Sequence, residues 1–531
     1  MAPLHDIASI GTTPRLVRAA AEAYGSLAAI EEGDVALSFE DLAREGLRAA
    51  RAFMAAGVEP GDRVAIWAPN VYEWVLAAIG LQSAGAALVP LNTRYKGAEA
   101  AYILNKSRAR VLCTVGEFLG TDYAALARAQ ETPSVERVVS LRGASEGAQS
   151  WSAFLAEGES VAESAALARA LAVSPDDLAD VMFTSGTTGK PKGVMTAHGQ
   201  NLRVFEVWSG VVGLREGDRY LIVNPFFHSF GYKAGWLSSI MRGVTVLPHP
   251  VFDVKEVLER VSKDRISVLP APPTIYQSIL AFPDLAKYDI SNLRLAVTGA
   301  AAVPVELVHR MRDELGFETI VTAYGLTEST GTVSICQPDD DAETIANTSG
   351  CAIPDVEVRC VDPDGHEVPR GEPGEVVVRG YNVMKGYFED EAATREAIDA
   401  DGWLHTGDIA VMDERGYLRI TDRIKDMFIM GGFNCYPAEI ESLLFEMPGV
   451  AQVAVIGVPD ERMGEVGMAF VVPKGGAALT PEAVVAWSRQ HMANFKVPRF
   501  VKLLDALPVN ASGKVTKNEL RELAAREGVG A

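Results

Sequence analysis

Short apolar runs alternate along this chain with segments whose apolar residues recur at helical spacing. The runs 63–67, 86–89, 220–223, 267–270 and 295–298 predict buried strands, and the segments between them predict helices. Regular alternation of helix and strand is typical of parallel sheets covered by helices. We therefore expect α/β architecture as far as about Ser349.

The most apolar stretch of the chain, 74–91, is interrupted by Gly80, Gln82, Ser83 and Gly85. A membrane-spanning helix needs about 20 mostly apolar residues in succession. A buried helix, a glycine turn and a strand fit this stretch better. We expect no stable membrane insertion.

The pattern changes after Ser349. Turn signals at 362–365, 371–374 and 413–416 separate short strands such as 375–379, as in an antiparallel barrel. The last hundred or so residues, with an apolar run at 452–457, predict a separate α+β unit. We expect a large domain over residues 1–423 and a small domain over 424–531.

Composition narrows the function classes. The chain has 531 residues, too many for one ordinary core, and its 48% hydrophobic and 22% charged residues are those of a globular protein. A formal charge of −21 would repel a phosphate backbone, so we expect no nucleic-acid partner. The five cysteines lack ligand spacing, and residues 1–24 lack a signal-peptide core, so we expect a cytoplasmic protein.

The segment 184–193 combines three glycines, four hydroxyl side chains and two lysines. Glycine lets backbone N–H groups approach an anion, hydroxyls donate to phosphate oxygens, and lysine neutralises charge. A solvated surface turn is the less specific alternative, but an apolar strand end precedes this segment. The predicted phosphate contacts are Thr184, Ser185, Gly186, Thr187, Thr188, Gly189 and Lys192.

This loop differs from a P-loop, in which Gly-Lys is followed by a Ser or Thr that holds Mg²⁺. Pro191 follows Gly189 and Lys190 here, and proline removes a backbone donor. The loop resembles the signature loop of the adenylate-forming superfamily. That superfamily includes acyl-CoA synthetases, aryl-CoA ligases, luciferases and peptide-synthetase adenylation domains.

Four further segments resemble motifs of the superfamily in the same order along the chain. They are Tyr324-Gly325-Leu326-Thr327-Glu328, residues 403–408, residues 422–426 and residues 508–514. The resemblance covers nearly the whole chain. It implies an α/β fold with a large N-terminal domain of two α/β sheet subdomains plus a distorted antiparallel β-barrel, and a small mobile α+β C-terminal domain.

The resemblance also implies which residues bind ATP and Mg²⁺. The implied adenine and ribose contacts are Tyr324, Gly325, Gly299, Ala300, Ala301, Asp408 and Arg423. Thr327 would reach the α-phosphate, while Thr184 and Glu328 would hold Mg²⁺. These residue types suit the roles, because carboxylates accept hydrogen bonds from vicinal hydroxyls and guanidinium groups pair with phosphate.

Lys514 ends a tight turn in the sequence Ser512-Gly513-Lys514. An isolated lysine near a C-terminus is ordinarily only solvated, but the resemblance assigns Lys514 to adenylation. That step brings a carboxylate to the ATP α-phosphate, and a lysine can stabilise the two anions. We expect Lys514 to act in catalysis with Thr184, Glu328 and His228.

The segment 224–231 resembles the aromatic and histidine motif of the superfamily's acyl pocket. The resemblance implies that His228 gates the acyl and CoA channels, and we expect Tyr232, Trp236 and Tyr276 to line the pocket. Packing in the core is the alternative for these aromatics. Peptide-synthetase domains need an aspartate near this motif, and none occurs from 224 to 251, which argues against an amino-acid substrate.

The segment 430–441 resembles the loop that lines the pantetheine tunnel for CoA. Gly431 and Gly432 would let the thin thiol arm approach the backbone. The resemblance makes Lys425 the pivot about which the small domain re-orients between the two reaction steps. Cys435 has no activating neighbour in sequence, so we expect it to pack rather than react.

These observations predict an AMP-forming acyl-CoA ligase that uses a small carboxylic acid, ATP, Mg²⁺ and CoA, with a homodimer as an open expectation. An acyl-AMP ligase is one alternative, although the short run from Gly407 to Lys425 leaves no room for that group's insertion. A nucleotide-sensing module without turnover is another, which Lys514 disfavours.

The acid is suggested by three segments, 226–236, 272–277 and 428–436. They resemble actinobacterial ligases for the indanedione propanoate (HIP) of steroid and cholesterol degradation. Aromatic residues at Tyr232, Trp236 and Tyr276 suit a compact alicyclic acid. A medium-chain fatty acid or an aryl acid is the alternative substrate.

Overall fold

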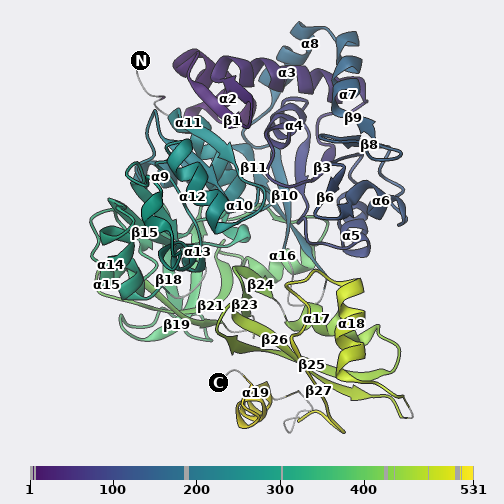
Figure 1. Ribbon diagram of the computed structural model, residues 1–531, viewed down its shortest axis with the longest axis vertical. Helices are drawn as coiled ribbons and strands as arrows, with labels where there is room; N and C mark the ends of the chain where they lie inside the picture. The colour runs from purple at the N-terminus through teal and green to yellow at the C-terminus, as the bar shows by residue number, and fades with distance from the viewer. Residues whose placement is uncertain are drawn as a thin grey trace. The chain divides into compact units, whose positions relative to one another are not determined.

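The computed structural model describes residues 4, 7–184, 190–299, 303–423, 428–435, 437–475, 477–508, 515 and 517–529, without the side chains of 8, 421–423, 434, 438, 442 and 518. The chain divides into two compact units (Figure 1). The first comprises Met1–Thr93, Ala101–Phe183 and Gly193–Thr421, and the second Arg94–Ala100, Thr184–Lys192 and Asp422–Ala531. The boundary expected at 423/424 stays a prediction.

The first unit contains a largely parallel sheet built from the apolar runs of the N-terminal half. In the described residues its order is β20 (Gly386–Tyr387), β11 (Lys192–Ala197), β10 (Leu178–Thr184), β4 (Ala87–Pro90), β3 (Arg63–Trp67), β5 (Val111–Thr114), β8 (Arg137–Ser140) and β9 (Gln149–Ser150). Strands β3, β4, β5 and β8 pair in parallel register. The parallel sheet expected from the helix and strand alternation is thereby confirmed.

The apolar stretch 74–91 forms the helix, turn and strand that its sequence predicts. Helix α4 (Tyr72–Ser83) is buried on nearly all sides, Gly85 turns the chain at φ +87°, and β4 follows. Helix α4 packs closely on α3 (Phe39–Ala55), where a Cβ on Gly80 would lie 2.5 Å from that of Ala49. Gly80 thus permits the close approach of the two helices.

A second sheet of this unit carries several residues of the candidate site. One part runs in the order β12 (Arg219–Ile222), β13 (Thr245–Pro248), β1 (Ala28–Glu32) and β2 (Val35–Ser38), and another in the order β14 (Leu295–Thr298), β15 (Thr319–Tyr324), β16 (Ser334–Ile335) and β17 (Cys351–Ala352). Val268 joins the two parts through parallel bridges to Tyr220 and Leu295. The predicted strand 267–270 is therefore reduced to one bridged residue, Val268, because Pro270 and the prolines that follow cannot donate to a ladder.

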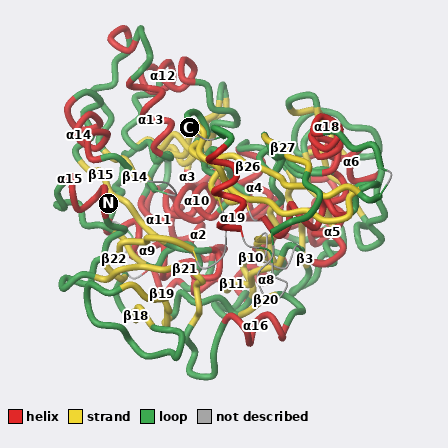
Figure 2. Tube along the Cα trace, turned by 90° about the horizontal axis from the view of Figure 1, so that it is seen from below, coloured by secondary structure: helices red, strands yellow, loops and turns green. Residues whose placement is uncertain are grey.

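The antiparallel section predicted after Ser349 is confirmed. It has the order β18 (Val356–Val361), β19 (Pro373–Gly380), β21 (Leu404–Met412) and β22 (Leu418–Arg423), which Figure 2 shows as neighbouring yellow tubes. Gly365, Gly371 and Gly416 have φ values of +83°, +87° and +83° in the intervening turns. Those left-handed conformations explain the glycines of the turn signals.

Several of the remaining helices of the first unit have well-defined termini. Asp253, for example, caps α12 (Val254–Lys263) by accepting a hydrogen bond from the N–H of Glu256 at 3.0 Å. These helices include α2 (Thr13–Tyr24), α7 (Trp151–Glu157), α8 (Glu163–Ala172), α9 (His198–Val211), α10 (Ser229–Gly231), α11 (Ser238–Arg242), α12 (Val254–Lys263), α13 (Pro273–Leu280), α14 (Val305–Asp313), α15 (Ala342–Asn347) and α16 (Glu391–Ala397).

The second unit has its own core and its own sheet. In the described residues the order is β24 (Phe433–Cys435), β23 (Phe428–Met430), β26 (Gly464–Pro473) and β25 (Val450–Asp460), with β27 (Phe500–Leu503) paired to β26. Helices α17 (Pro437–Phe445), α18 (Pro481–His491) and α19 (Lys517–Arg526) accompany this sheet. Buried side chains including Val455, Phe470 and Leu520 form the core of the α+β unit that the sequence predicts.

Candidate active site

Two residues expected to bind the nucleoside meet in the first unit. Tyr324 ends β15 and Asp408 lies on β21, and the Tyr324 hydroxyl donates to the Asp408 carboxylate at 2.6 Å. The Asp408 residue is only 1% exposed. This contact joins two motifs that lie 84 residues apart in the chain.

Gly299 lies beside this pair at the carboxyl end of β14, which is parallel to β15. Its φ is +155°, and a Cβ there would lie 3.3 Å from the carbonyl oxygen of Ala323. A side chain at this position would crowd the strand end that carries Tyr324. The placement suits a flat ring packed on backbone, while Ala300 and Ala301 lie outside the described residues.

Glu328, the expected Mg²⁺ ligand, lies in the short 3₁₀ turn Thr327–Ser329. Its carboxylate accepts a hydrogen bond from the Tyr387 hydroxyl at 3.0 Å, and its carbonyl accepts one from the Met384 N–H at 2.8 Å. The side chain is partly buried. Carboxylate oxygens are ligands that Mg²⁺ prefers, so the side chain suits this ion.

The backbone after Tyr324 folds back on itself, which explains Gly325. A Cβ on Gly325 would lie 2.3 Å from the carbonyl oxygen of Gly331. No side chain fits that space. Thr330 and Gly331 complete the loop with φ values of +59° and +108°.

The expected acid-binding segment adjoins this loop. A Cβ on Gly331 would lie 3.4 Å from the Cβ of Ser229, the residue after His228. The His228 side chain is exposed, and its Nδ1 accepts from the Phe230 N–H at 3.3 Å. The protein packed around the imidazole nevertheless lowers its pKa, so His228 is neutral near pH 7. A neutral imidazole suits the expected role of His228 as a gate better than a role as a general acid.

Three aromatic residues that are expected to line the acid pocket lie in the core of the described structure. Tyr232, Trp236 and Tyr276 are each 0% exposed. Tyr232 stacks on Trp236 with ring centroids 4.8 Å apart, and Trp74 packs against both. These contacts are those of core residues, so in this structure the three rings do not form an open pocket wall. Lining the acid pocket stays a prediction for them.

Tyr276 belongs to a different part of the core. Its hydroxyl donates to the carbonyl of Leu269 at 2.6 Å, and its ring meets Phe317 edge to face at 5.8 Å. A buried phenol needs such a partner, and this hydrogen bond supplies one. The packing alone therefore accounts for the residue.

Several expected site residues fall outside the described residues. They are Ser185, Gly186, Thr187, Thr188, Gly189, Lys425 and Lys514, and the side chain of Arg423 is outside as well. The ends of the phosphate loop are described: Thr184 is the last residue of β10, and Lys192 is the first of β11. These two strands are neighbours in the sheet.

In the second unit, Gly431 and Gly432 form the turn between β23 and β24. Their φ values are +57° and +83°, as a two-residue hairpin turn requires, and Met430 pairs with Phe433 across it. Cys435 is fully buried, and burial raises its thiol pKa to about 12. That thiol is a poor nucleophile at neutral pH.

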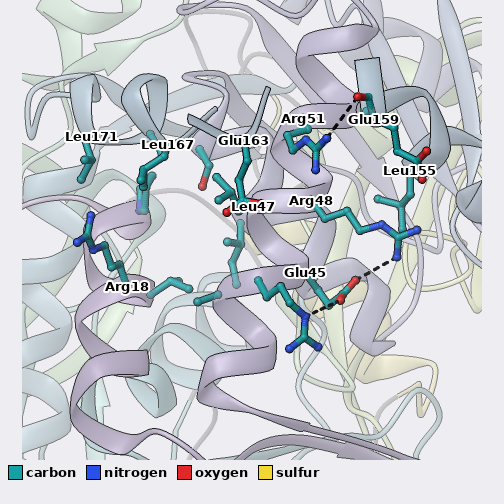
Figure 3. A pocket seen from close by; sticks show the side chains of 18 residues that line it. Arg18, Glu45, Leu47, Arg48, Arg51, Leu155, Glu159, Glu163, Leu167 and Leu171 are labelled. Atoms are coloured by element: carbon teal, nitrogen blue, oxygen red, sulfur yellow. Dashed lines mark hydrogen bonds and ion pairs between the residues drawn. The ribbon is translucent and has the colours of Figure 1, made fainter. Parts of the chain in front are cut away.

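A hollow of about 470 Å³ lies elsewhere in the first unit, between α2, α3 and α8 (Figure 3). Its rim carries Arg48, which pairs with Glu45 at 3.3 Å, and Arg51, which donates to the carbonyl of Glu159 at 3.4 Å. Its apolar side includes Leu167 and Leu171. None of its lining residues belongs to the motifs described above.

Two protein-family models match this chain, one over its N-terminal part and one over its C-terminal part. The AMP-binding enzyme model matches residues 17–388, and the AMP-binding enzyme C-terminal domain model matches residues 439–514. The chain belongs to the AMP-binding enzyme family. The expected AMP-forming acid–CoA ligase class and α/β fold class are confirmed.

Similar proteins cover almost the whole chain. A 3-[(3aS,4S,7aS)-7a-methyl-1,5-dioxo-octahydro-1H-inden-4-yl]propanoyl:CoA ligase of Rhodococcus jostii is 52% identical over 96% of this chain and 98% of its own. The Mycobacterium tuberculosis protein of the same name is 52% identical over 90% of this chain and 91% of its own. A feruloyl-CoA synthase of Amycolatopsis is 40% identical over 93% of this chain and 95% of its own.

Solved structures give the same result for the fold. The amide bond synthetase McbA of Marinactinospora thermotolerans matches with a TM-score of 0.83 at 29% identity, over 96% of this chain and 99% of its own. In the part of the chain that the structure describes, no helix has the length and apolarity to cross a membrane.

Sequence reasoning missed two groups of residues near the site. Tyr387, which donates to Glu328, follows the Glu328 motif by 59 residues and belongs to no motif of its own. Asp180 and Lys233 are also missed, although both are 0% exposed. Their signal was weak: a charged residue inside an otherwise apolar run at 179–183, and a lysine among the aromatics of 230–236.

Proposed function

We propose that this enzyme converts the indanedione propanoate of steroid degradation into its CoA thioester. The acid carboxylate attacks the α-phosphate of ATP, which gives acyl-AMP and releases pyrophosphate. The CoA thiol then attacks the acyl carbon, and AMP leaves. The observation that carries the choice of acid is the 52% identity, over nearly the full length, to a ligase named for that acid.

The described geometry of the first unit supports the nucleotide half of this proposal. Tyr324 and Asp408 would hold adenine and ribose, and their mutual hydrogen bond would orient the carboxylate toward the ribose hydroxyls. Gly299 would let the ring pack against backbone. Thr327, one residue before Glu328, would reach the α-phosphate.

Mg²⁺ is part of the proposal. Glu328 would hold the ion together with Thr184, and the bound ion would neutralise phosphate charge. The Tyr387 hydroxyl would orient the Glu328 carboxylate through its hydrogen bond at 3.0 Å. Hydrogen bonding from a neighbouring residue is the usual way in which a ligating carboxylate is fixed.

For the acid and CoA we propose the remaining motif residues. His228 would separate the acyl and CoA channels as a neutral imidazole, and Gly431 and Gly432 would lie along the pantetheine arm. Lys514 would stabilise the charge of the adenylation step, and Lys425 would be the pivot between steps. A cytoplasmic location and a homodimer belong to the same proposal.

A substrate panel tests this function. Purified enzyme is given ATP, Mg²⁺, CoA and, separately, the indanedione propanoate, octanoate, benzoate and ferulate, and thioester formation is measured by mass spectrometry. We expect kcat/KM to be at least about tenfold higher for the indanedione propanoate, which corresponds to roughly 1.4 kcal/mol. Preference for another acid would contradict the substrate and leave the ligase class intact.

A further inference from the structure

Three segments that precede or follow the predicted substrate sites meet in one buried polar cluster of the first unit. Asp180 lies on β10, four residues before Thr184, and Thr196 lies on β11, four residues after Lys192. Lys233 lies five residues after His228. All three side chains are 0% exposed.

The cluster is closed by short polar contacts. The Lys233 ammonium lies 3.1 Å from the Asp180 carboxylate and donates to the Thr196 hydroxyl at 3.0 Å. That hydroxyl donates to Asp180 Oδ1 at 2.6 Å. Asn201 of α9 donates to the other carboxylate oxygen at 2.7 Å. Each of the three segments is therefore bonded to the other two.

A second bridge runs alongside the first. The Gln82 amide donates both to the carbonyl of Ala179, next to Asp180, and to the hydroxyl of Tyr232, next to Lys233, each at 2.9 Å. Strand β10 and the segment that carries Lys233 are thus linked at two adjacent positions, directly by the ion pair and indirectly through Gln82. This limits both sliding and rotation of the two segments.

Lys233 belongs to an unusual backbone segment. Residues Tyr232–Leu237 form a π-helix, in which each turn holds an extra residue. The hydroxyls of Ser238 and Ser239 donate to the carbonyls of Lys233 and Gly235 at 2.8 and 2.9 Å, which stabilises the wide turn. Single π-turns occur frequently at functional sites.

Stability alone does not explain such a pair. Removing two charges from water costs several kcal/mol for each ion, so apolar residues of similar volume are often neutral or stabilising replacements. A buried ion pair does fix the relative position of its two side chains, because separating the charges in the protein interior costs much free energy. The cluster therefore restricts geometry more than it stabilises the fold.

We propose that Asp180 and Lys233 are positioning residues for adenylation. The pair holds both stem strands of the phosphate loop in register with the segment that follows His228, so that the ATP α-phosphate and the acid carboxylate meet at reactive distance. This inference rests on the proposed two-step ligase function. The transfer of a preformed acyl group to CoA needs this register less.

The test is the double substitution Asp180→Asn/Lys233→Met in the full-length enzyme. It removes both charges together and leaves neither buried alone. We expect kcat for acid-dependent pyrophosphate exchange into ATP to fall at least about tenfold, because small misplacements of reactants cost up to about 10² in rate. KM for ATP should change less than about threefold, and thioester formation from supplied acyl-AMP should stay within about twofold.

Asp218→Asn/Arg294→Met is the matched control. Asp218 and Arg294 are also buried in the first unit and joined by a bond of 2.8 Å, but their further hydrogen bonds run to Ser267 and Gly213. Its exchange and transfer rates should change by the same factor. A selective loss of exchange in this control as well would contradict the proposal.

Thr196→Val decides the matter if the double variant fails to fold. It keeps both charges and nearly the same volume but removes the hydroxyl that joins them, and we expect exchange to fall at least threefold with transfer unchanged. Wild-type exchange rates in the variants, or equal losses in both half-reactions, would overturn the inference alone. No exchange by the wild-type enzyme with any acid of the panel would overturn the proposed function and this inference together.

Discussion

The Tyr324 hydroxyl and the Asp408 carboxylate are joined by a hydrogen bond of 2.6 Å between strands of two different sheets. Asp408 is almost fully buried, so its carboxylate depends on neighbouring donors for its orientation. The family resemblance assigns these two residues separate roles, one against adenine and one on ribose. Their contact couples the two roles.

Tyr324→Phe should therefore weaken ATP binding without removing any predicted direct contact of Asp408. Hydrogen bonds to charged groups contribute about 1.5–3 kcal/mol, so we expect KM for ATP to rise about tenfold. The measurement is a steady-state titration of ATP at saturating acid and CoA. KM for the acid should change little.

Tyr123→Phe is the control for this substitution. Tyr123 is also buried, and its hydroxyl donates to the carbonyl of Thr93 at 3.0 Å, apart from every predicted site residue. The control should lose some stability but keep its KM for ATP. An unchanged KM in Tyr324→Phe would show that the contact has no part in nucleotide binding.

Glu328→Gln should raise the Mg²⁺ requirement. The substitution keeps the shape and the hydrogen bond from Tyr387 but replaces a charged ligand oxygen by a neutral amide. We expect the half-saturating Mg²⁺ concentration to rise at least about tenfold, with a smaller rise for Tyr387→Phe, because orienting partners of ligands contribute about 10-fold to 100-fold in affinity. Activity is measured against Mg²⁺ concentration at fixed ATP.

Glu343→Gln provides the comparison for that titration. Glu343 is an exposed helix residue whose carboxylate accepts from Asn347 at 2.9 Å. Its Mg²⁺ dependence should equal that of the wild type. If Glu328→Gln behaves in the same way, the metal role of Glu328 is wrong.

The sequence predicted those parts of the fold that depend on local pattern. Apolar runs located β3 and β14, and glycines located the turns at Gly85 and Gly416, because burial and positive φ each select few residue types. The run 267–270 forms less of a strand than its apolar residues predict, because an apolar pattern does not show which residues lack a backbone N–H. Its prolines limit it to the two bridges made by Val268.

The candidate site was predictable where family motifs carry it and less so elsewhere. Tyr324 and Asp408 were found by motif, but their contact depends on the pairing of distant strands. Asp180 and Lys233 carry only a weak signal in the sequence, because the apolar or aromatic neighbours of a charged residue do not establish that its side chain is buried. For the aromatics near His228 the sequence does not separate a pocket wall from a core, because aromatic side chains pack equally well in both.

Two buried histidines should make the fold sensitive to mild acid. Burial lowers the pKa of His198 and of His249 to about 4, from an ordinary value of 6.5. The unfolded chain therefore binds more protons between these values, so stability is complete above about pH 6.5 and decreases as pH falls toward 4. Each histidine should lower the free energy of unfolding by about 1 kcal/mol between pH 7 and pH 5.5.

His198→Gln tests this dependence. The His198 Nδ1 contacts the Thr13 hydroxyl at 3.2 Å, a contact that a neutral amide can replace. Urea unfolding at pH 7 and pH 5.5 should show that the variant loses about 1 kcal/mol less than the wild type over this interval. An identical loss in both proteins would mean that folding does not lower the pKa of His198.

The core packing of Trp236 predicts that Trp236→Ala reduces stability without changing the choice of acid, which is the opposite of what its expected role in the acid pocket predicts. Trp236 is 0% exposed and packs against Tyr232 and Trp74, so truncation leaves a cavity in the core. Such substitutions cost about 3–5 kcal/mol. We expect a lower unfolding free energy, and kcat/KM values for the indanedione propanoate and octanoate that change by the same factor, to within about threefold.

Trp151→Ala separates this outcome from a role in the acid pocket. Trp151 is 9% exposed and stacks on Phe154 at 5.7 Å, in α7, which carries none of the predicted site residues. Both variants should lose stability and keep the ratio of kcat/KM for the two acids. A tenfold shift of that ratio in Trp236→Ala, but not in Trp151→Ala, would show that Trp236 contacts the acid after all. The core then opens around substrate, because a side chain without accessible surface can contact a ligand only if its neighbours move.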